Sequence, residues 1–587
     1  FDDNFPYQRY NQFVMQSGIF KHFQKEKGAC MIMKKQTKLV AVLSTAALMS
    51  LGASMISFAA SGWVEEDGAW VFYNRDKEKA TEEWKKSGNN WFWLDDNGQM
   101  ATDQLVEDDD DYYYVNEAGA MVTNQWVSIE NENSGEEGEP DHYWYYFQAN
   151  GKAYKRSSSA SDSSVSAKTI NGKKYAFDDE GRMLFGWVSG GERQSDDDAW
   201  KECDYYFGGQ DDGAMSLGWQ QIHIVDDEYA DLQPGDEYWG EEQDRWFYFQ
   251  TSGKKITVDS GTDDTLKTKT INGKKYGFDE YGRMISGWFT DAASFNNATQ
   301  GVSTYSSSFM YFNNPESGAR YTKGWFKVVP GYYLDESKYN DGEENWYYAD
   351  GSGNIYSNEI RNIKGKKYAF DEYGRMVNGL VFLEMKDEDG RISSTYISQV
   401  IDDDNYDTEE EFDGFAADHM SEINSGLYRC FYFGNTDDCS MKTGKQTVTI
   451  DGDSFTFNFK DSSSLKGAAI HGMDDHKLYM AGKLIKADSD DKYQIVIYKT
   501  VTDENAGKVI TMEKMDTEDF LDTYCTEKST DKETIWTVNP RDKAENTKFY
   551  LVNTSGAMVK TKSAAKDGED YKFSVSNYEI TKVVLDQ

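Results

Sequence analysis

The chain has 587 residues and is strongly acidic, since 103 Asp and Glu against 62 Lys and Arg give a formal net charge of -41 at pH 7. Mean hydropathy is -0.78, yet aromatic residues make up 15% of the chain, a share that intrinsic disorder does not explain. The charge argues against nucleic acid as a partner and against unassisted docking to phosphate polymers. It favours a cationic ligand.

The N-terminal residues predict export from the cell. Residues 1–32 precede a Met-Lys-Lys start at Met33 and are interpreted as translated upstream sequence or an expression artefact. Residues 33–59 are predicted to be a signal peptide, because lysines precede the apolar stretch Leu39 to Leu51 and small residues stand at Ser57-Phe58-Ala59. No later stretch has the roughly 18 consecutive apolar residues of a membrane helix. With no hydrophobic tail or sorting signal at the C-terminus, we expect a secreted, extracellular protein associated non-covalently with the cell wall.

One phrase recurs three times and defines the organisation of the chain. Each copy reads Asn or Lys, then Gly-Lys-Lys-Tyr, Ala or Gly, Phe-Asp, and after two more residues Gly-Arg-Met. The copies are Asn171 to Met183, Asn272 to Met284 and Lys364 to Met376. Such self-similarity predicts an array of repeats. The leading dipeptide predicts a two-residue hairpin turn, because both of its positions need positive φ.

The strand after this turn predicts how the repeats pack. Alternation in residues 174–177 puts Tyr175 and Phe177 on one face. One aromatic face per hairpin cannot form a core alone, so neighbouring hairpins must stack on it. The stretches between the copies carry a looser phrase with the same order: an aromatic strand, a polar turn with glycine and a second strand. This looser phrase begins at Trp91, Tyr112, Trp144, Tyr205, Trp246, Met310, Trp346 and Phe549.

The predicted fold class is therefore all-β: an elongated solenoid of stacked β-hairpin repeats with short irregular or helical insertions. Residues 60–155 are expected to form N-terminal hairpin repeats of the cell-wall-binding type. Residues 168–460 are expected to form three long units that start near 168, 269 and 361, and 465–587 to form degenerate hairpin repeats. Helical spacing between Asp407 and Ile423 predicts a small helical insertion.

The sequence lacks the common catalytic and phosphate-binding motifs. It contains no Gly-x-Ser-x-Gly, no phosphate loop and no His-Glu-x-x-His, so we expect no enzyme, no catalytic residue and no cofactor. His471 and His476 flank two aspartates, but their spacing misses one helical face, and no metal site is predicted. Cys430 and Cys439 flank one hairpin turn, and both a disulfide and two free thiols remain open for them.

The tryptophan phrases carry a family resemblance. Gly62-Trp63 followed by Trp70, and Gly218-Trp219, resemble the choline-binding or cell-wall-binding repeat of Gram-positive surface proteins. The Asn-Gly-Lys-Lys-Tyr phrase is similar to related repeats of clostridial toxins and glucan-binding proteins. The resemblance covers roughly Trp63 to Val584 and implies shallow sites between consecutive hairpins. In choline-binding members these sites are aromatic boxes that hold a quaternary ammonium.

Transferred to this chain, the resemblance implies ligand boxes that join a Gly-Trp tryptophan to the first aromatic residue of the following strand. The pairs are Trp63 with Trp70, Trp126 with Trp144, Trp219 with Trp246, and Trp325 with Trp346. Trp63 with Trp70 keeps the family's short separation and is the favoured pair. The competing interpretation is that most of these tryptophans form the core.

Two functions from different classes follow. The first is a secreted protein that binds the bacterial envelope, through choline-type groups of teichoic acid or through wall glycan. The alternative is an extracellular adhesin or spacer that binds host or glucan-type carbohydrate, or host proteins.

Overall fold

The computed structural model describes residues 61–585 except positions 137, 158, 161–164, 228–241, 260, 262–264, 291–304, 389–390, 504–506, 532, 540–545 and 569. The segments 1–32 and 33–59, with the predicted signal peptide, lie outside the described residues. The chain forms two compact units. One reaches to Val225 and includes Trp246–Ile256, and the other contains Asp226–Arg245 and the chain from Thr257 onward. This division falls inside the predicted middle segment 168–460, and the predicted elongation of the whole solenoid stays a prediction.

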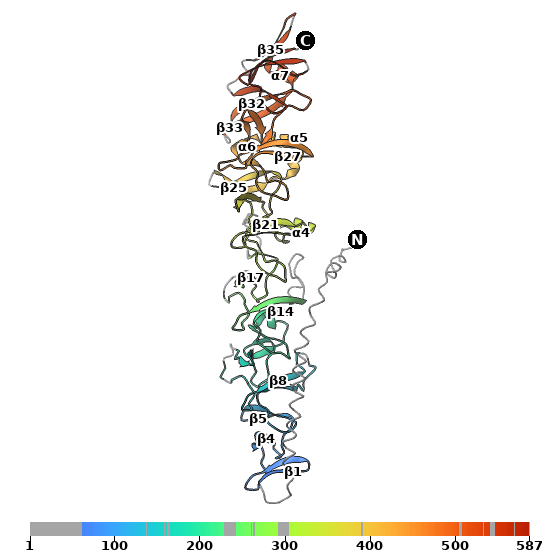
Figure 1. Cartoon of the computed structure of the whole chain (residues 1–587), viewed down its shortest axis with the longest axis vertical. Coiled ribbons are helices and arrows are strands. Elements are labelled where there is room, and N and C mark those ends of the chain that lie inside the picture. Colours follow the sequence, from blue (N-terminus) through green and yellow to red (C-terminus); the bar gives the residue numbers. More distant parts are fainter. Residues whose placement is uncertain are drawn as a thin grey trace, which may run out of the picture. The chain divides into compact units, whose positions relative to one another are not determined.

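Strands dominate the described part of the chain, and helices are few. The first unit is a succession of antiparallel hairpins in chain order (Figure 1). Its pairs are β1 (Gly62–Glu66) with β2 (Ala69–Tyr73), β3 (Glu83–Ser87) with β4 (Asn90–Leu94), β5 (Gln104–Asp108) with β6 (Asp111–Val115), β7 (Gln125–Glu130) with β8 (His142–Phe147), β9 (Lys168–Ile170) with β10 (Lys173–Tyr175), β11 (Gly186–Ser189) with β12 (Glu192–Gln194) and β13 (Tyr205–Phe207), and β14 (Gly218–Val225) with β15 (Glu242–Phe249), of which the residues from Trp246 onward belong to this unit. The short helix α2 (Ala199–Glu202) precedes β13.

The second unit begins with hairpins of the same kind. They are β16 (Lys267–Ile271) with β17 (Lys274–Phe278), β18 (Trp288–Phe289) with β19 (Met310–Tyr311), β20 (Gly324–Val328) with β21 (Asn345–Ala349), and β22 (Glu359–Ile363) with β23 (Lys366–Phe370). Helix α4 (Glu336–Asp341) lies in the connection between β20 and β21.

The two-residue turns of the recurring phrase are confirmed. Asn171 and Gly172 have φ angles of 50° and 84°, and Lys364 and Gly365 have 52° and 86°. Positive φ at both central positions is the conformation that joins two strands with the correct twist. A lysine adopts it in the third copy although asparagine and glycine are the residues that favour it.

A recurrent backbone hydrogen bond joins each hairpin to the one before it. The N–H of the methionine in the Gly-x-Met phrase donates to the carbonyl of the first tryptophan in the aromatic strand of the preceding hairpin. The pairs are Met100 to Trp70 at 2.7 Å, Met121 to Trp91 at 2.8 Å, Met183 to Trp144 at 2.7 Å and Met376 to Trp346 at 2.8 Å. This bond fixes the register of the stack.

Methionine and glycine of the Gly-x-Met phrase fit together between repeats. Gly151 has φ +85°, and a Cβ there would lie 2.4 Å from Sδ of Met121, the methionine of the preceding repeat. The turn therefore needs glycine for its backbone conformation and for the space that methionine fills.

The Asp-x-x-Gly-Arg part of the recurring phrase forms a turn closed by an ion pair. Arg Nε lies 2.6 to 2.7 Å from Asp Oδ2 in all three copies, Arg182–Asp178, Arg283–Asp279 and Arg375–Asp371. The other carboxylate oxygen accepts backbone N–H groups of the same turn. Burial raises the pKa of Asp178 and of Asp371, while the neighbouring arginine opposes that rise.

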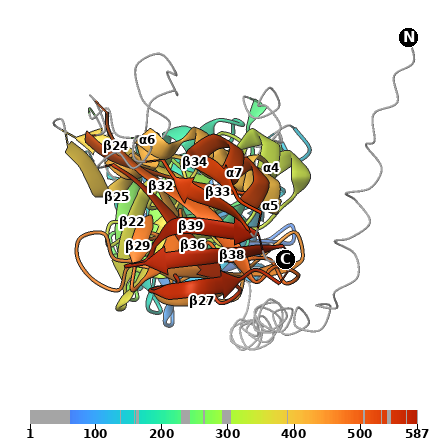
Figure 2. The same cartoon turned by 90° about the horizontal axis from the view of Figure 1, so that it is seen from above.

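Beyond residue 380 the architecture changes from hairpins to larger sheets. A five-stranded sheet has the order β23-β22-β25-β24-β26, a second one the order β27-β28-β31-β30-β29, and an eight-stranded sheet the order β33-β32-β36-β39-β35-β34 with β37 and β38 attached (Figure 2). Their strands are β24 (Leu380–Glu388), β25 (Arg391–Val400), β26 (Tyr428–Tyr432), β27 (Gly444–Ile450), β28 (Asp453–Phe459), β29 (Gly472–Asp474), β30 (Lys477–Met480), β31 (Lys483–Leu484), β32 (Tyr493–Asp503), β33 (Gly507–Met515), β34 (Cys525–Ser529), β35 (Thr534–Val538), β36 (Thr547–Asn553), β37 (Lys562–Lys566), β38 (Tyr571–Ser576) and β39 (Glu579–Leu585).

Short helices accompany these sheets. They are α5 (Glu409–Asp418), α6 (Met420–Ser425), α7 (Thr517–Tyr524) and the 3₁₀ turn η2 (Asp403–Asn405). Helix α5 starts at Thr408 with a reciprocal capping box to Glu411 and buries Phe412 and Ala416. The predicted helical insertion is thus confirmed.

The C-terminal segment 465–587 differs from the expected degenerate hairpins. The stacking bond recurs there, since Met558 N–H donates to His476 O at 3.2 Å. However, the strands from β32 onward join the eight-stranded sheet, which buries residues such as Phe549, Leu551 and Val583. Long strands that are rich in β-branched residues, such as β32, pair with a neighbour on each side. They therefore form a larger sheet and not a two-stranded hairpin.

Cys430 and Cys439 form no disulfide in the structure. Cys430 and Cys439 are both buried and unbridged, so the structure adopts the free-thiol alternative. Burial raises the pKa of Cys430 and of Cys439, which keeps these thiols protonated at neutral pH.

Candidate functional site

Ring clusters occupy the junctions between consecutive hairpins, and they are built from the same positions each time. A tryptophan stands on the first strand of a hairpin, and an aromatic residue lies directly across from it on the second strand. Trp126 pairs with Tyr146 in this way, and Trp325 with Tyr348. Aromatic residues of the following hairpin complete each cluster.

The first cluster, called the Trp126 cluster, consists of Trp126, Tyr146, Tyr154, Tyr175 and Phe177. The Trp126 ring meets Tyr146 edge-on at 5.1 Å between centroids, Tyr175 edge-on at 4.9 Å, and stacks on Phe177 at 5.8 Å. Tyr154 stacks on Tyr146 at 5.7 Å. Trp126, Tyr146 and Tyr154 are half-buried, so parts of their rings face solvent.

The second cluster, called the Trp325 cluster, repeats this arrangement with Trp325, Tyr348, Tyr356, Tyr368 and Phe370. Trp325 lies 4.9 Å from Tyr348, 4.8 Å from Tyr368 and 5.8 Å from Phe370, the last with the same 26° between ring planes as in the first cluster. Tyr356 stacks on Tyr348 at 5.6 Å. Both clusters arise where an aromatic hairpin precedes a copy of the Gly-Lys-Lys-Tyr-Ala-Phe phrase, so one sequence pattern produces one geometry twice.

The ring faces of such clusters can hold a cation or stack against the face of a sugar. Tryptophan and tyrosine faces carry negative charge density and attract an ammonium group. Burial raises the pKa of Tyr175 and of Tyr356, so these phenols stay neutral at physiological pH and keep a hydroxyl that donates hydrogen bonds.

Carboxylates lie beside both clusters. Trp144 Nε1 donates to Asp211 Oδ1 at 3.3 Å, and His142 Nε2 lies 3.0 Å from the same oxygen. Beside the second cluster, Lys366 Nζ lies 3.2 Å from Asp438 Oδ1, as Lys173 Nζ lies 3.0 Å from Asp212 Oδ1 beside the first. The first lysine of the phrase Gly-Lys-Lys thus ties the first and third copies to acidic side chains further along the chain, and the surroundings favour a cation over a phosphate.

The structure places the predicted tryptophan pairs as follows. Trp126 and Trp144 both pack on the buried group around Tyr175 and Met183, but the ring directly across from Trp126 is Tyr146. Trp144 stands two positions earlier, across from Ser128. Because residues i and i+2 of a strand share a face, the two tryptophans lie on one side of the hairpin without ring contact.

The other long-spaced pairs differ from each other. Trp219 and Trp246 do meet, edge-on at 6.3 Å, and Trp219 also meets Tyr248 at 5.1 Å. Trp346, in contrast, is exposed and lies across from Lys327. As ligand residues all four pairs stay predictions.

The favoured pair, Trp63 with Trp70, has a related geometry. Trp63 lies across from Phe72, and Trp70 across from Glu65. Trp63 meets Phe72 at 5.3 Å and Phe92 of the next hairpin at 5.4 Å. Its Nε1 atom is buried and has no hydrogen-bond partner among the described residues.

Several ring clusters were missed by sequence reasoning. Trp84 meets Trp93 at 5.3 Å and Tyr113 at 5.0 Å, although Glu83 and not glycine directly precedes this tryptophan. Trp187 and Trp288, which belong to none of the predicted pairs, each contact several rings, including Phe247 at 5.4 Å and Tyr347 at 4.8 Å respectively. The overlooked signal was the aromatic residue two positions after the first one, which lies across from the tryptophan.

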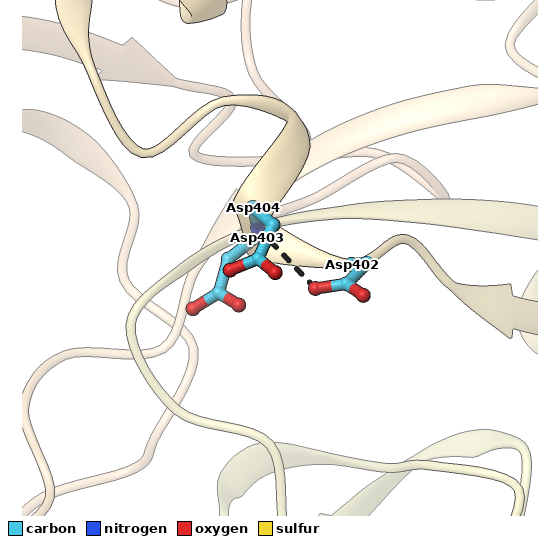
Figure 3. Close-up of side chains that lie close together, drawn as sticks. All are labelled: Asp402, Asp403 and Asp404. Atoms are coloured by element: carbon cyan, nitrogen blue, oxygen red, sulfur yellow. Dashed lines mark hydrogen bonds between the residues drawn. The ribbon is translucent and has the colours of Figure 1, made fainter.

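A group of three aspartates lies away from the ring clusters. Asp402, Asp403 and Asp404 bring carboxylate oxygens within 4.8 Å of one another, and Asp402 Oδ1 accepts the N–H of Asp404 at 3.3 Å as the cap of η2 (Figure 3). All three are exposed, and the cap explains the position of Asp402.

His471 Nε2 donates to Ile510 O at 3.0 Å while its Nδ1 accepts the N–H of Ala481 at 3.2 Å, which leaves neither ring nitrogen for a metal. Of the helices in the described residues, none is long and apolar enough to span a membrane.

Comparison with known proteins supports the resemblance found in the sequence. Residues 80–126, which include the Trp84 junction, match the family model of the choline-binding repeat. Glucosyltransferase-S of Streptococcus mutans serotype c (strain ATCC 700610 / UA159) is 24% identical over 280 residues. That match covers 41% of this chain and 16% of the glucosyltransferase, so the chain spans only a small part of that relative.

Solved structures of Streptococcus pneumoniae proteins are also similar. The modular autolysin LytC in complex with a synthetic peptidoglycan ligand is 18% identical, with 56% of each chain covered and a TM-score of 0.28. The choline-binding domain of CbpL is 18% identical, with 39% of this chain and 88% of that chain covered and a TM-score of 0.23. Choline binding protein F is 15% identical, with 73% and 100% covered and a TM-score of 0.20.

Proposed function

We propose that this chain, which carries repeats of the choline-binding type, binds the carbohydrate polymers of a bacterial cell wall non-covalently through the ring clusters at its hairpin junctions. The observation that carries the proposal is the duplication of one five-ring geometry in the Trp126 and Trp325 clusters. Core packing alone does not require five matching rings, because cores tolerate exchange among apolar residues of similar size. Repeated binding sites for a repeated ligand do require it.

The ligand group that fits best is a quaternary ammonium, as in the choline groups of wall teichoic acid. Ring faces attract it with roughly 0.5 to 2 kcal/mol per ring. Asp211 next to Trp144 adds a carboxylate close by, and the net charge of -41 attracts cations from a distance. Single junctions are weak sites, but several junctions on one polymer raise the overall affinity through effective concentration.

A glucan is the second candidate ligand. The similarity to a glucosyltransferase supports it, and so do the neutral phenols of Tyr175 and Tyr356, which can donate hydrogen bonds to sugar hydroxyls while the rings stack on sugar faces. In either case the chain acts outside the cell as a wall-associated or carbohydrate-binding protein, and it performs no chemistry of its own.

Titration of the full chain with choline, and separately with an α-glucan oligomer, distinguishes the two ligands. Tryptophan fluorescence reports binding because tryptophans belong to the clusters. We expect a saturable change with choline, reduced in Trp126→Leu and in Trp325→Leu and reduced further in the double variant, because leucine fills the space but offers no ring face.

Trp536→Leu is the matched control. Trp536 lies in β35 of the eight-stranded sheet and meets Tyr571 at 5.9 Å, so its replacement should leave the choline response of the clusters unchanged. Saturation by glucan alone would assign the clusters to sugar binding. A response to neither ligand, or one unaffected by the two cluster variants, would contradict the proposal.

A further inference from the structure

Lysine replaces methionine at two of the stacking positions. Lys255 bridges to Phe249 as Met183 bridges to Phe177, and its N–H donates to Asp204 O at 2.7 Å as that of Met183 donates to Trp144 O at 2.7 Å. The Lys255 side chain therefore starts from the same place in its junction as a stacking methionine. Lys79, which bridges to Tyr73, is the other lysine at this position.

Lys255 directs its ammonium group into the rings of its junction. The residue is only 4% exposed. Its Nζ lies 5.2 Å from the ring centre of Trp187 and 5.9 Å from that of Phe247. Nζ also donates to the carbonyl of Trp200 and lies 3.5 Å from that of Lys201. These carbonyls belong to the last turn of α2, where the helix itself offers no N–H to satisfy them.

The rings around this ammonium form a junction of the same design as the Trp126 cluster. Trp187 lies across from Tyr206 and meets it at 4.9 Å, and it meets Phe247 at 5.4 Å and Phe249 at 6.2 Å. The Trp187 junction thus has the cation, the ring faces and the hydrogen-bond acceptors of a filled ammonium site. Burial of the charge is offset by these contacts.

Lys79 shows that the position alone does not produce this arrangement. Its side chain is 33% exposed and its Nζ lies 3.1 Å from Oε2 of Glu66. That lysine ends in a solvent-accessible ion pair, whereas Lys255 ends among rings.

We infer that Lys255 is an internal cationic ligand of the Trp187 junction and closes that junction to external ammonium ligands. Selectivity among junctions then depends on the residue at the methionine position. A methionine, as at Met183 and Met376, leaves the ring faces of its junction to an external ligand, and a buried lysine fills them. The closing of the Trp187 junction is independent of the proposed function, while the contrast with the Trp126 and Trp325 junctions rests on it.

The test is chemical complementation of Lys255→Ala in the full chain. This substitution removes a propylammonium fragment from the junction, so n-propylammonium is the probe and n-propanol its neutral counterpart. We expect Lys255→Ala to gain one saturable propylammonium site relative to the unmodified chain, by calorimetric titration, together with a change in tryptophan fluorescence and a raised melting temperature. Propanol should produce neither effect.

Two variants serve as controls. Lys255→Met keeps the volume without the charge and should gain no propylammonium site. Lys79→Ala removes the exposed lysine at the equivalent position and should gain none either. No additional site in Lys255→Ala, equal stabilisation by propanol, or the same gain in Lys79→Ala would overturn the inference. An unmodified chain that ignores choline while Lys255→Ala takes up propylammonium would refute the proposed function and leave this inference standing.

Discussion

The Trp126 and Trp325 clusters have the same five rings but different charges around them. In the Trp325 cluster the guanidinium of Arg361 lies 5.0 Å from the ring centre of Tyr356 and pairs with Glu359 at 2.6 Å. Lys168 holds the equivalent register position in the Trp126 cluster, across from Tyr175 as Arg361 is across from Tyr368. Within the described residues, no cation lies over the ring of Tyr154. Ring geometry is thus set by the repeat, whereas access of a cation is set by single substitutions around it.

The turns beside the two clusters also differ in the ion pairs that their arginines form. Arg182 pairs with Asp178 and with the exposed Glu180 of its own turn. Arg375 pairs with Asp371 and also, at 3.1 Å, with Asp335, a buried side chain from the connection between β20 and β21. In the second unit the turn therefore anchors an insertion, and its arginine compensates two buried carboxylates instead of one.

The largest effect expected from this comparison is on stability. Arg375→Met leaves the carboxylates of Asp335 and Asp371 buried without their cation, and loss of one partner from a buried ion pair costs about 3 to 5 kcal/mol. Arg182→Met leaves only Asp178 in that state and should cost about 1 to 3 kcal/mol. Urea unfolding of the unit that carries each variant, followed by tryptophan fluorescence, measures both.

Arg375→Lys is the control, because lysine keeps the positive charge but lacks the planar guanidinium group. It should recover part of the unfolding free energy that Arg375→Met loses. If Arg375→Met and Arg182→Met destabilise their units equally, the extra contact with Asp335 contributes nothing and the anchoring of the insertion is wrong.

Turn glycines should show an intermediate effect. Gly151 has φ +85° and lies against Met121, whereas Gly68 has φ +86° with nothing near its missing Cβ. Gly68→Ala should therefore cost about 1 to 2 kcal/mol for the left-handed backbone alone, and Gly151→Ala clearly more, because Met121 must also move. The double variant Gly151→Ala with Met121→Ala should recover the excess in unfolding free energy. Equal costs at Gly68 and Gly151 would show that the methionine does not pack as described.

The sequence was sufficient for the local elements and less so for their assembly. The two-residue turn at Asn171-Gly172 and the shared face of Tyr175 and Phe177 follow from φ preferences and the period of two. The register that places Tyr146 across from Trp126 was not predicted, because register depends on where an inserted loop ends, and the long connection 131–141 hides that point.

Long-range pairing explains the other differences. Strands β32 and β36 pair residues that lie between 48 (Lys499 with Thr547) and 60 (Tyr493 with Asn553) positions apart in the sequence, and no local pattern encodes such a partner. The sequence also did not predict that Lys255 fills the Trp187 junction. In the sequence Lys255 is a polar residue after a turn, and only the structure shows its ammonium group among the rings. Substitutions at a repeat position therefore carry information that only the stacked structure reveals.

The smallest expected effect concerns ligand affinity at the second cluster. Arg361→Ala removes the guanidinium over Tyr356, so the Trp325 cluster should bind choline more tightly by roughly two- to five-fold, which corresponds to the 0.5 to 1 kcal/mol of one exposed cation–π contact. Lys168→Ala, at the equivalent position of the Trp126 cluster, should leave affinity unchanged, since that lysine covers no ring in the described structure. Choline titrations in a Trp126→Leu background isolate the second cluster for the first variant, and a Trp325→Leu background isolates the first cluster for the second. Equal gains from both substitutions would mean that removal of positive charge, rather than exposure of the Tyr356 ring, increases the affinity.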